Sequence, residues 1–456
     1  MKKIYLAIAC IVVTSMPLLA QSPALKTRTV TTGLDTPWEI LWTPNNDIWA
    51  SERLGRISSI NPTTGERKEL LKISDAAEVG EGGLLGMVLD PDFSQNKFVY
   101  VAYNYLATGS DYREKIVRYT YDSASEKLIQ PLILLDNIDG ANNHNGCRMI
   151  ISPDKKLLLT TGDAQVTSTS QNVKNINGKV LRINLDGSIP SDNPIANSPV
   201  WSWGHRNAQG LVFSPNGKIL YSSEHGANND DEVNIIQKGR NYGWPRVEGK
   251  CDNALEQGFC KDSNVVEPIY AWTPTLGVAG MDFYNSNLIP EWKNSLLVTS
   301  LKGSRVTQLQ LSNDGGTVVK ATDFYVNTYG RLRDICISPE GKVYIAVSNK
   351  DGRGIPKADD DKIVEIVPSS TSIHQTLSGN MLSIYPNPIT DKLQVYYSAA
   401  LAAPILYCLR NHLGQVIEQG KSSESLFSLS LNDVAPGIYY LHIEIGKERI
   451  VERVVK

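Results

Sequence analysis

Short hydrophobic runs recur along most of the chain, separated by polar turns of similar composition. Four of these turns have a proline at their second position: Asp90–Phe93, Ser152–Lys155, Ser214–Gly217 and Ser338–Gly341. Their prolines are 62, 62 and 124 residues apart, and 124 is twice the first spacing. A repeat of this length, built from short strands and turns, is typical of a β-propeller.

About 345 residues at this period predict about six blades of four strands each. The missing copy of the turn is expected near residue 277, shortly before Met281–Tyr284, and a looser copy occupies Thr43–Asp47. We therefore expect an all-β fold, with a six-bladed β-propeller over residues 24–368. The pattern predicts strands at Lys97–Tyr103, Leu157–Thr161, Ile219–Ser223, Ser295–Ser300 and Val343–Val347.

The pattern changes beyond a last propeller strand near Val364–Val367. Residues 369–381 are rich in Ser, Thr and Gly and are expected to form a linker. Residues 382–456 alternate hydrophobic and polar positions, as in Lys392–Tyr397 and Tyr439–Ile445. Such alternation is typical of strands with one buried face, so we expect a small C-terminal β-sandwich.

The N-terminus has the pattern of a cleaved signal peptide. Two lysines precede a hydrophobic run from Ile4 to Val13, and residues 1–20 end in Leu-Leu-Ala before Gln21. The formal net charge of the 456-residue chain is −3, and it becomes −5 once the two lysines are removed. Because this charge is mild and no basic block occurs, we expect no nucleic-acid partner.

Export implies an oxidising compartment, in which disulfides persist. Cys251 and Cys260 lie nine residues apart in a loop-like segment and are expected to form a disulfide. Cys147, Cys336 and Cys408 are scattered, and we interpret each as a small hydrophobic residue. No spacing of cysteines and histidines fits a zinc site.

The segment from Trp203 to Pro245 concentrates polar residues at the ends of predicted strands. Gly204–Asn207 precedes the strand Leu211–Phe213, and an acidic loop, Asn228–Glu232, follows the next strand. Functional side chains are commonly carried by loops on a rigid scaffold. The segment therefore predicts a site on the rim of a β-sheet.

Several motifs resemble the soluble pyrroloquinoline-quinone (PQQ) sugar dehydrogenases, the glucose/sorbosone dehydrogenase family. The resemblance covers about residues 30–367, and the motifs occur in the family's order. They are GHRNAQGLVFSPNGK and NYGWP in the segment above, Glu81–Gly86, Asn143–Arg148, Thr161–Asp163, Ser300–Lys302 and Arg331–Asp334. The family fold is a six-bladed propeller, in agreement with the period found independently.

The C-terminal segment resembles the sorting domain of type IX secretion substrates. The matching parts are Tyr385–Pro388, Gly414–Val416, Gly437–Leu441 and the basic end Arg453–Lys456. This resemblance implies transport by the type IX machinery and a secreted or outer-membrane-surface protein. The alternative is a carbohydrate-binding or spacer β-sandwich.

The family resemblance implies a catalytic role for three residues. His144 is the implied general base, because an imidazole titrates near neutral pH and can take a sugar hydroxyl proton. Asp163 would hold that histidine in one tautomer, and Arg206 would stabilise negative charge on the hydride acceptor. The alternatives are a structural histidine, a turn aspartate and a surface arginine.

The resemblance also implies a set of residues that bind the cofactor. PQQ carries three carboxylates, so a ring of cations is what its binding requires. The implied residues are Glu81, Asn143, Gln171, Arg206, Asn207, Thr275, Lys302, Arg331 and Arg333. Glu81 departs from the glutamine common in the family, and Asn143 replaces an acidic neighbour of the base. The loops are also shorter than in the dimeric glucose enzymes of the family. Together these departures favour a broader range of aldose substrates.

Calcium is implied twice by the resemblance. Backbone carbonyls at Gly226 and Ala227 would hold an ion that bridges to PQQ. A second ion would use Asp231, Glu232 and Tyr242. The alternative is an acidic loop that is merely solvated.

These observations predict a PQQ- and calcium-dependent aldose dehydrogenase that oxidises the C1 hydroxyl of a sugar to a lactone. Its electrons would pass to an acceptor that the sequence does not identify. One alternative is a calcium-dependent propeller lactonase or esterase, which does not explain the ring of cations. Another is a non-catalytic binding propeller, which does not explain the set of histidine, aspartate and arginine residues.

Overall fold

The computed structural model describes residues 25–368, 373–377, 380–387, 389, 391–398, 401, 403–446 and 448–456. The predicted signal peptide, residues 1–20, lies outside this part of the chain. The described chain divides into two units, and the boundary between them in the sequence is at Pro368. None of its helices is long and hydrophobic enough to span a membrane.

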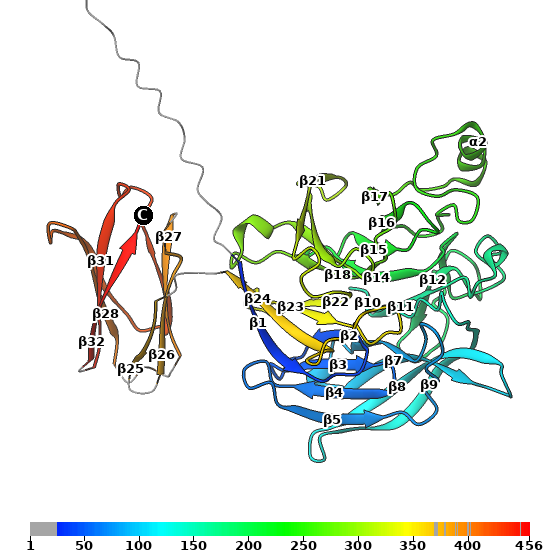
Figure 1. The fold of residues 1–456 in the computed structure, drawn as a ribbon, viewed down its shortest axis with the longest axis horizontal. Helices are drawn as coiled ribbons and strands as arrows, with labels where there is room; N and C mark the ends of the chain where they lie inside the picture. The colour runs from blue at the N-terminus through cyan, green and yellow to red at the C-terminus, as the bar shows by residue number, and fades with distance from the viewer. Residues whose placement is uncertain are drawn as a thin grey trace, which may run out of the picture. The chain divides into compact units, whose positions relative to one another are not determined.

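The first unit contains six four-stranded antiparallel sheets, so the predicted six-bladed propeller is confirmed (Figure 1). Blades 1 and 2 comprise β2 (Pro37–Trp42), β3 (Ile48–Glu52), β4 (Arg56–Ile60), β5 (Arg67–Lys72), β6 (Leu84–Leu89), β7 (Phe98–Leu106), β8 (Tyr112–Asp122) and β9 (Lys127–Asp139). Blades 3 and 4 comprise β10 (Met149–Ile151), β11 (Lys156–Thr161), β12 (Lys179–Asn184), β13 (Val200–Trp203), β14 (Ala208–Phe213), β15 (Leu220–Glu224), β16 (Asp231–Ile236) and β17 (Tyr270–Trp272). Blades 5 and 6 comprise β18 (Val278–Tyr284), β19 (Ser295–Ser300), β20 (Arg305–Leu311), β21 (Val318–Phe324), β22 (Leu332–Ile337), β23 (Val343–Val347), β24 (Lys362–Pro368) and β1 (Leu25–Thr32).

Blade 6 closes the propeller, because the N-terminal strand β1 pairs with β24 in one sheet. Beside this pairing, Leu34 N donates to the Asp361 carbonyl at 3.0 Å. Because β1 leads directly into blade 1, this pairing ties the first blade to the last. The first strand of each blade lines a central cavity of about 340 Å³.

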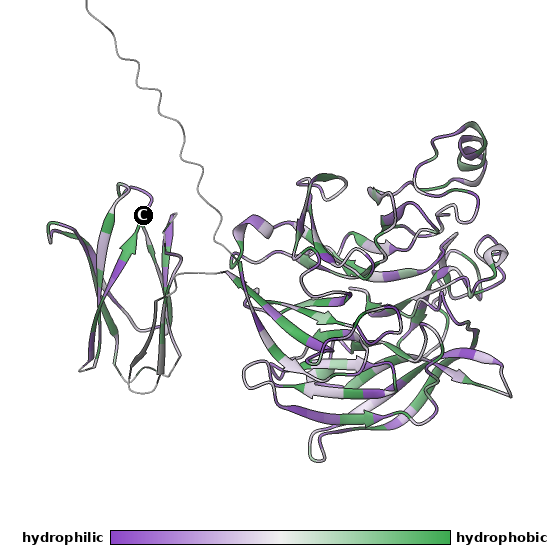
Figure 2. Ribbon diagram, viewed as in Figure 1, coloured by the Kyte–Doolittle hydropathy of each residue, from purple (hydrophilic) through white to green (hydrophobic). Residues whose placement is uncertain are grey.

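The core lies between neighbouring blades, because alternate side chains of each strand point to opposite faces of its sheet. One hydrophobic cluster joins blades 2 and 3 through residues such as Tyr100, Leu159 and Leu181. Another joins blades 4 and 5 through Tyr221 and Leu309. Figure 2 shows hydrophobic segments along the strands and mostly hydrophilic loops between them.

The missing copy of the repeated turn is not near residue 277, so that prediction is wrong. The corresponding turn lies between β18 and β19 and contains the short 3-10 helix η2 (Pro290–Trp292). The shift arises in blade 4, where the loop between β16 and β17 includes helix α2 (Ala254–Ser263). The other short helices are α1 (Phe93–Asn96) and η1 (Thr167–Thr169).

The predicted disulfide between Cys251 and Cys260 is present, with a Cα–Cα distance of 6.5 Å. It ties helix α2 to the segment that precedes it, and Asn253 caps the helix by accepting hydrogen bonds from two backbone N–H groups. No side chain of α2 is buried. Cys147 and Cys336 are free and buried in hydrophobic clusters, as predicted.

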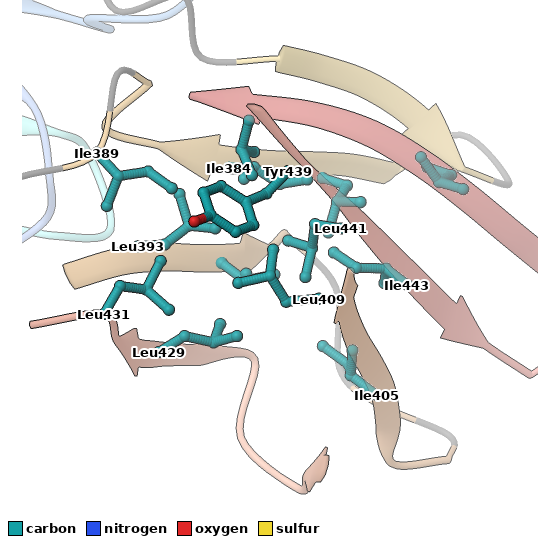
Figure 3. Close-up of a cluster of buried hydrophobic side chains, with 14 of the residues drawn as sticks. Ile384, Ile389, Leu393, Ile405, Leu409, Leu429, Leu431, Tyr439, Leu441 and Ile443 are labelled. Carbon is teal, nitrogen blue, oxygen red and sulfur yellow. The ribbon is translucent and has the colours of Figure 1, made fainter. Parts of the chain in front are cut away.

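The C-terminal unit is the predicted β-sandwich, with two four-stranded sheets. One sheet comprises β25 (Ile373–Leu377), β26 (Asn380–Tyr385), β27 (Lys392–Tyr397) and β30 (Leu426–Ser430). The other comprises β29 (Val416–Ser422), β28 (Ile405–Asn411), β31 (Ile438–Ile445) and β32 (Glu448–Val455). Side chains from both sheets, including Leu393, Leu409 and Leu441, meet in one hydrophobic core (Figure 3).

Strand β25 lies inside the segment that was predicted to be a linker. Its residues pair with β26 over the full length of β25, from Ile373–Ile384 to Leu377–Asn380. The linker prediction is therefore wrong for residues 373–377, because a short strand with the polar residues His374, Gln375 and Thr376 is accommodated at a sheet edge.

Candidate active site

The predicted site residues lie in loops at one end of the propeller. Most of them precede the first strand of a blade or follow its second strand. Because these two strands are antiparallel, the start of one and the end of the other lie at the same end of the sheet. Asn143 and His144 precede β10, Asp163 follows β11, and Arg206 and Asn207 precede β14. The repeated topology therefore brings segments that are distant in sequence to one face.

His144 is held by a buried carboxylate. Its Nδ1 lies 2.7 Å from Oδ1 of Asp163, whose side chain is fully buried. Oδ2 of Asp163 accepts a hydrogen bond from Trp244 Nε1 at 2.9 Å, and Oδ1 also accepts one from Gln165 N at 2.9 Å. Because an ionised carboxylate only accepts, the hydrogen must sit on Nδ1 and the Nε2 lone pair is left available.

The backbone around this pair is closely packed. A Cβ atom on Gly162 would lie 1.7 Å from the His144 carbonyl oxygen, so only glycine allows the two segments to approach this closely. Ala164 N donates to the same carbonyl at 3.2 Å, and Asp163 N donates to the Arg206 carbonyl at 2.9 Å. Packing thus orients both His144 and Asp163 before any ligand binds.

Glu224 organises the loop that carries Arg206. The Nδ1 atom of the buried His205 lies 2.9 Å from Glu224 Oε2. The His205 ring stacks on the ring of Tyr242, with their centres 4.6 Å apart. The backbone N–H groups of Arg206 and Asn207 both donate to Glu224 Oε1. His205 is therefore a structural histidine, whereas the Arg206 and Asn207 side chains remain available to the site.

Arg206 and Arg333 form no ion pair with a carboxylate among the residues that the structure describes. The Arg206 guanidinium lies 5.3 Å from the ring centre of Trp244. Arg333 donates to Gln209 Oε1 at 2.9 Å, and Gln209 donates in turn to Asn207 Oδ1 at 3.0 Å. Burial lowers the pKa of Arg333 to about 10, and the positive charge of Arg331 adds to this.

Four buried nitrogen atoms without a hydrogen-bond partner belong to residues at this face: Arg206 Nε, Asn207 Nδ2, His225 Nε2 and Arg333 Nε. Elsewhere in the described part of the chain, the same holds for Trp42 Nε1, Trp49 Nε1, Asn104 Nδ2 and Arg148 Nη2. Burial also lowers the pKa of His225. A buried polar atom left without a partner is costly, so such a group indicates a ligand that supplies acceptor atoms.

The acidic loop after β15 is folded rather than merely solvated. Asp231 is fully buried, and its carboxylate accepts from the backbone N–H groups of Gly226 at 2.9 Å, Leu276 at 2.7 Å and Val278 at 3.1 Å. This carboxylate therefore fixes the loop whose carbonyl groups at Gly226 and Ala227 were predicted to bind calcium.

A cavity of about 20 Å³ adjoins this loop, enough for one ion or water molecule. Its lining includes the carboxylates of Glu224, Asp230, Glu232 and Glu248, together with Tyr242. Burial, followed by the charge of Glu224, raises the pKa of Glu232 to about 8. Within the described residues, no three His, Cys, Asp or Glu side chains could hold a metal by themselves, so a cation here would need carbonyl oxygens.

Glu81 lies beside His144 and is paired with a cation. Its Oε1 contacts Arg353 Nη1 at 2.8 Å, and its Oε2 lies 3.5 Å from the backbone N of His144. Arg353 also donates through Nη2 to Asn143 Oδ1 at 2.9 Å. The carboxylate that replaces the family's glutamine at position 81 is therefore paired with the Arg353 guanidinium.

The glucose/sorbosone dehydrogenase family model matches residues 34–356. The chain belongs to this family. It is 31% identical to quinoprotein glucose dehydrogenase B of Acinetobacter calcoaceticus over 438 residues, which cover 78% of this chain and 91% of that protein. It is 29% identical to an aldose sugar dehydrogenase of Escherichia coli over 358 residues, which cover 74% and 95%.

Solved structures give the same result. The chain superposes on a PQQ-bound aldose sugar dehydrogenase from Streptomyces coelicolor with a TM-score of 0.66 and 33% identity, covering 76% of this chain and 99% of that one. Residues 383–456 match the secretion system C-terminal sorting domain. The predicted family and sorting domain are confirmed, and the sorting domain indicates export to the surface or medium through type IX secretion.

The remaining residues predicted to bind the cofactor have different surroundings. Gln171 uses its amide on Asn241 and on the Trp244 carbonyl, so its polar atoms brace the wall of the site. Lys302 is exposed and forms no ion pair within the described residues, whereas Thr275 is half-buried before β18. Cofactor contacts by these three residues stay predictions.

Arg331 differs from Arg333 because it has a carboxylate partner. Its Nε donates to Asp351 Oδ2 at 2.6 Å, and its backbone N donates to Asn349 Oδ1 at 2.8 Å. One of the four cationic residues that the resemblance assigned to the cofactor is thus paired with a carboxylate of the chain itself. Its contact with the cofactor also stays a prediction.

Sequence reasoning missed several residues that build the site. Trp244 lies in the NYGWP motif but was not connected with Asp163, and Glu224 was not connected with Arg206. Lys179 is fully buried and donates to the carbonyls of Thr169, Ser170 and Asn177, which fixes the loop after Asp163. The charged side chains of Glu224 and Lys179 at strand ends were the available signal for those two residues.

Proposed function

We propose that this chain is an exported, PQQ- and calcium-dependent aldose dehydrogenase that oxidises the C1 hydroxyl of a sugar to a lactone. The observation that carries the proposal is the His144–Asp163 pair together with Arg206 and Arg333, each of which has a buried Nε atom without a hydrogen-bond partner. Family membership supports the same reaction, because the relatives include sugar dehydrogenases.

His144 acts as the general base in this proposal. Its Nδ1 is occupied by Asp163, so Nε2 is the atom that takes the C1 hydroxyl proton. Loss of that proton, together with departure of a hydride from C1, converts the cyclic sugar to a lactone. Asp163 stabilises the positive charge that develops on the imidazole, and its burial makes that interaction stronger than in water.

The residues present fit PQQ. Its three carboxylates would supply acceptors for Arg206, Asn207 and Arg333, whose buried nitrogens lack partners. Lys302 and Arg331 would add positive charge from blades 5 and 6. When bound, PQQ supplies the acceptor for the hydride that leaves C1. An external acceptor, a redox dye in the assay below, then takes up the electrons.

The acidic loop fits calcium. The Gly226 and Ala227 carbonyls would hold one ion, and Asp231, Glu232 and the Tyr242 carbonyl would hold a second. The raised pKa of Glu232 supports this proposal, because a cation in the adjoining cavity would offset the burial of the carboxylate.

The first experiment is to titrate the metal-free protein with PQQ and calcium, and then to follow dye reduction with a panel of aldoses. Saturable, calcium-dependent turnover is expected, and His144→Gln should abolish it while PQQ binding is retained. Turnover by His144→Gln at the wild-type rate would contradict the proposed base. Hydrolysis of lactones or esters without quinone would instead favour a propeller hydrolase.

A further inference from the structure

The side chain of Arg353, in the last blade, contacts two residues that lie beside the proposed base His144. Arg353 lies in the loop after β23, and its guanidinium contacts Glu81 at 2.8 Å and Asn143 at 2.9 Å. Glu81 precedes β6 in blade 2, and Asn143 precedes β10 in blade 3. Arg353 therefore connects three loops that are far apart in sequence.

The backbones that carry these three side chains are fixed independently of the contact. Glu81 N donates to the Asn142 carbonyl at 2.7 Å, and a Cβ on Gly80 would lie 2.0 Å from that carbonyl oxygen. Asp351 accepts from Arg353 N at 3.0 Å and from Arg331 Nε at 2.6 Å. The Glu81 and Asn143 side chains could still rotate, and the two contacts with the Arg353 guanidinium fix their orientation.

The contact determines which atoms face the space beside His144. A guanidinium only donates, so the oxygen of the Asn143 amide must face Arg353 and the NH₂ group is left to donate elsewhere. The Glu81 carboxylate keeps lone pairs on Oε2, on the side of His144. The site thus presents one hydrogen-bond acceptor and one donor next to the base.

The surrounding charges favour the ionised carboxylate. Burial opposes ionisation of Glu81, but the neighbouring His225, Arg353, Arg333 and His144 together lower its pKa below the usual value, and of these the two guanidinium groups are positively charged at neutral pH. Glu81 therefore acts as an acceptor across the neutral pH range.

We propose that Arg353 is a positioning residue for the sugar, which it serves by holding Glu81 as an acceptor and Asn143 as a donor beside His144. This inference rests on the proposed function. An acceptor and a donor placed together suit a neighbouring pair of neutral sugar hydroxyls, because each hydroxyl both donates and accepts. Loss of Arg353 leaves both side chains free to rotate. It therefore weakens substrate binding more than it slows the chemical step.

The test compares Arg353→Met and Arg353→Lys in the full mature chain loaded with PQQ and calcium. Arg353→Met should raise KM for the best aldose about tenfold while kcat changes by less than about twofold. Arg353→Lys should fall between, since one ammonium cannot reproduce a two-pronged contact. Lys357→Ala, in an exposed position of the same loop, is the matched control and should behave as wild type.

A second readout needs neither cofactor nor turnover. Glutamate labelled with ¹³C at Cδ reports the titration of each carboxyl group by NMR, and Glu81→Gln assigns the resonance of Glu81. The midpoint for Glu81 should move to higher pH in Arg353→Met and stay unchanged in Lys357→Ala.

The outcomes separate the two proposals. An unchanged Glu81 midpoint, or an unchanged KM in Arg353→Met with an active wild type, would refute the role of Arg353 and leave the proposed function standing. A wild type that turns over no aldose with PQQ would refute the proposed function and the sugar-positioning role together.

Discussion

Replacing Asp163 by asparagine tests whether the buried carboxylate sets the hydrogen-bonding state of His144. The carboxylate accepts three hydrogen bonds, from His144 Nδ1 at 2.7 Å, Gln165 N at 2.9 Å and Trp244 Nε1 at 2.9 Å. Asparagine has one acceptor atom and one donor group, so both orientations leave a conflict. The side chain is fully buried, and water cannot relieve that conflict.

The two orientations have different consequences. If the amide NH₂ faces Trp244, two donors oppose each other, at a cost of about 1–3 kcal/mol in stability. If it faces His144, Nδ1 becomes the acceptor, the hydrogen moves to Nε2 and the base is lost. We expect kcat to fall by about 10² to 10⁴, which is about 3–5 kcal/mol of activation free energy.

The assay is dye reduction at saturating PQQ, calcium and aldose, with PQQ affinity and thermal unfolding measured on the same samples. Trp244→Phe removes only the donor to Oδ2 and should cost less than about tenfold in kcat. Asp186→Asn, in an exposed turn, controls for the substitution itself. An Asp163→Asn variant that folds, binds PQQ normally and retains its kcat would refute the reasoning.

Three further results are expected. Arg333→Met should weaken PQQ binding about 10- to 100-fold by calorimetry, because it removes a buried cation, whereas the exposed Arg67→Met should leave the affinity unchanged. Chelation of calcium present at a hundred times its Kd should lower the Tm by about 4 °C for each of the two proposed sites, so the total shift should be smaller in Glu232→Gln; an equal shift in that variant would contradict the assignment of Glu232 to the second site. Lys179→Met removes the ammonium donor shared by three carbonyl oxygens, of which those of Thr169 and Ser170 keep a backbone donor, and should cost about 1–3 kcal/mol in urea unfolding, where an unchanged midpoint would count against the role assigned to Lys179.

Much of the fold follows from local pattern. Strands β19 and β23 begin and end where the short hydrophobic runs between polar turns predict, because strands buried on both faces have no polar side to interrupt the run. The turn near residue 277 was misplaced because a period assumes equal blades, and the loop with α2 lengthens blade 4. Residues 373–377 were taken for a linker because polar composition does not exclude a strand at a sheet edge.

The sequence by itself determined the propeller, the sandwich, the disulfide and the residue types that gather at the site, since spacing and motif order are local or family properties. Only the tertiary structure decided the partners. Arg353 and Asn143 are 210 residues apart, and Trp244 and Asp163 are 81 apart. No local pattern encodes such pairs, because they meet only when antiparallel blades close into a ring and bring their loops to one face. The same closure leaves Arg333 buried without a carboxylate while it pairs Arg331 with Asp351.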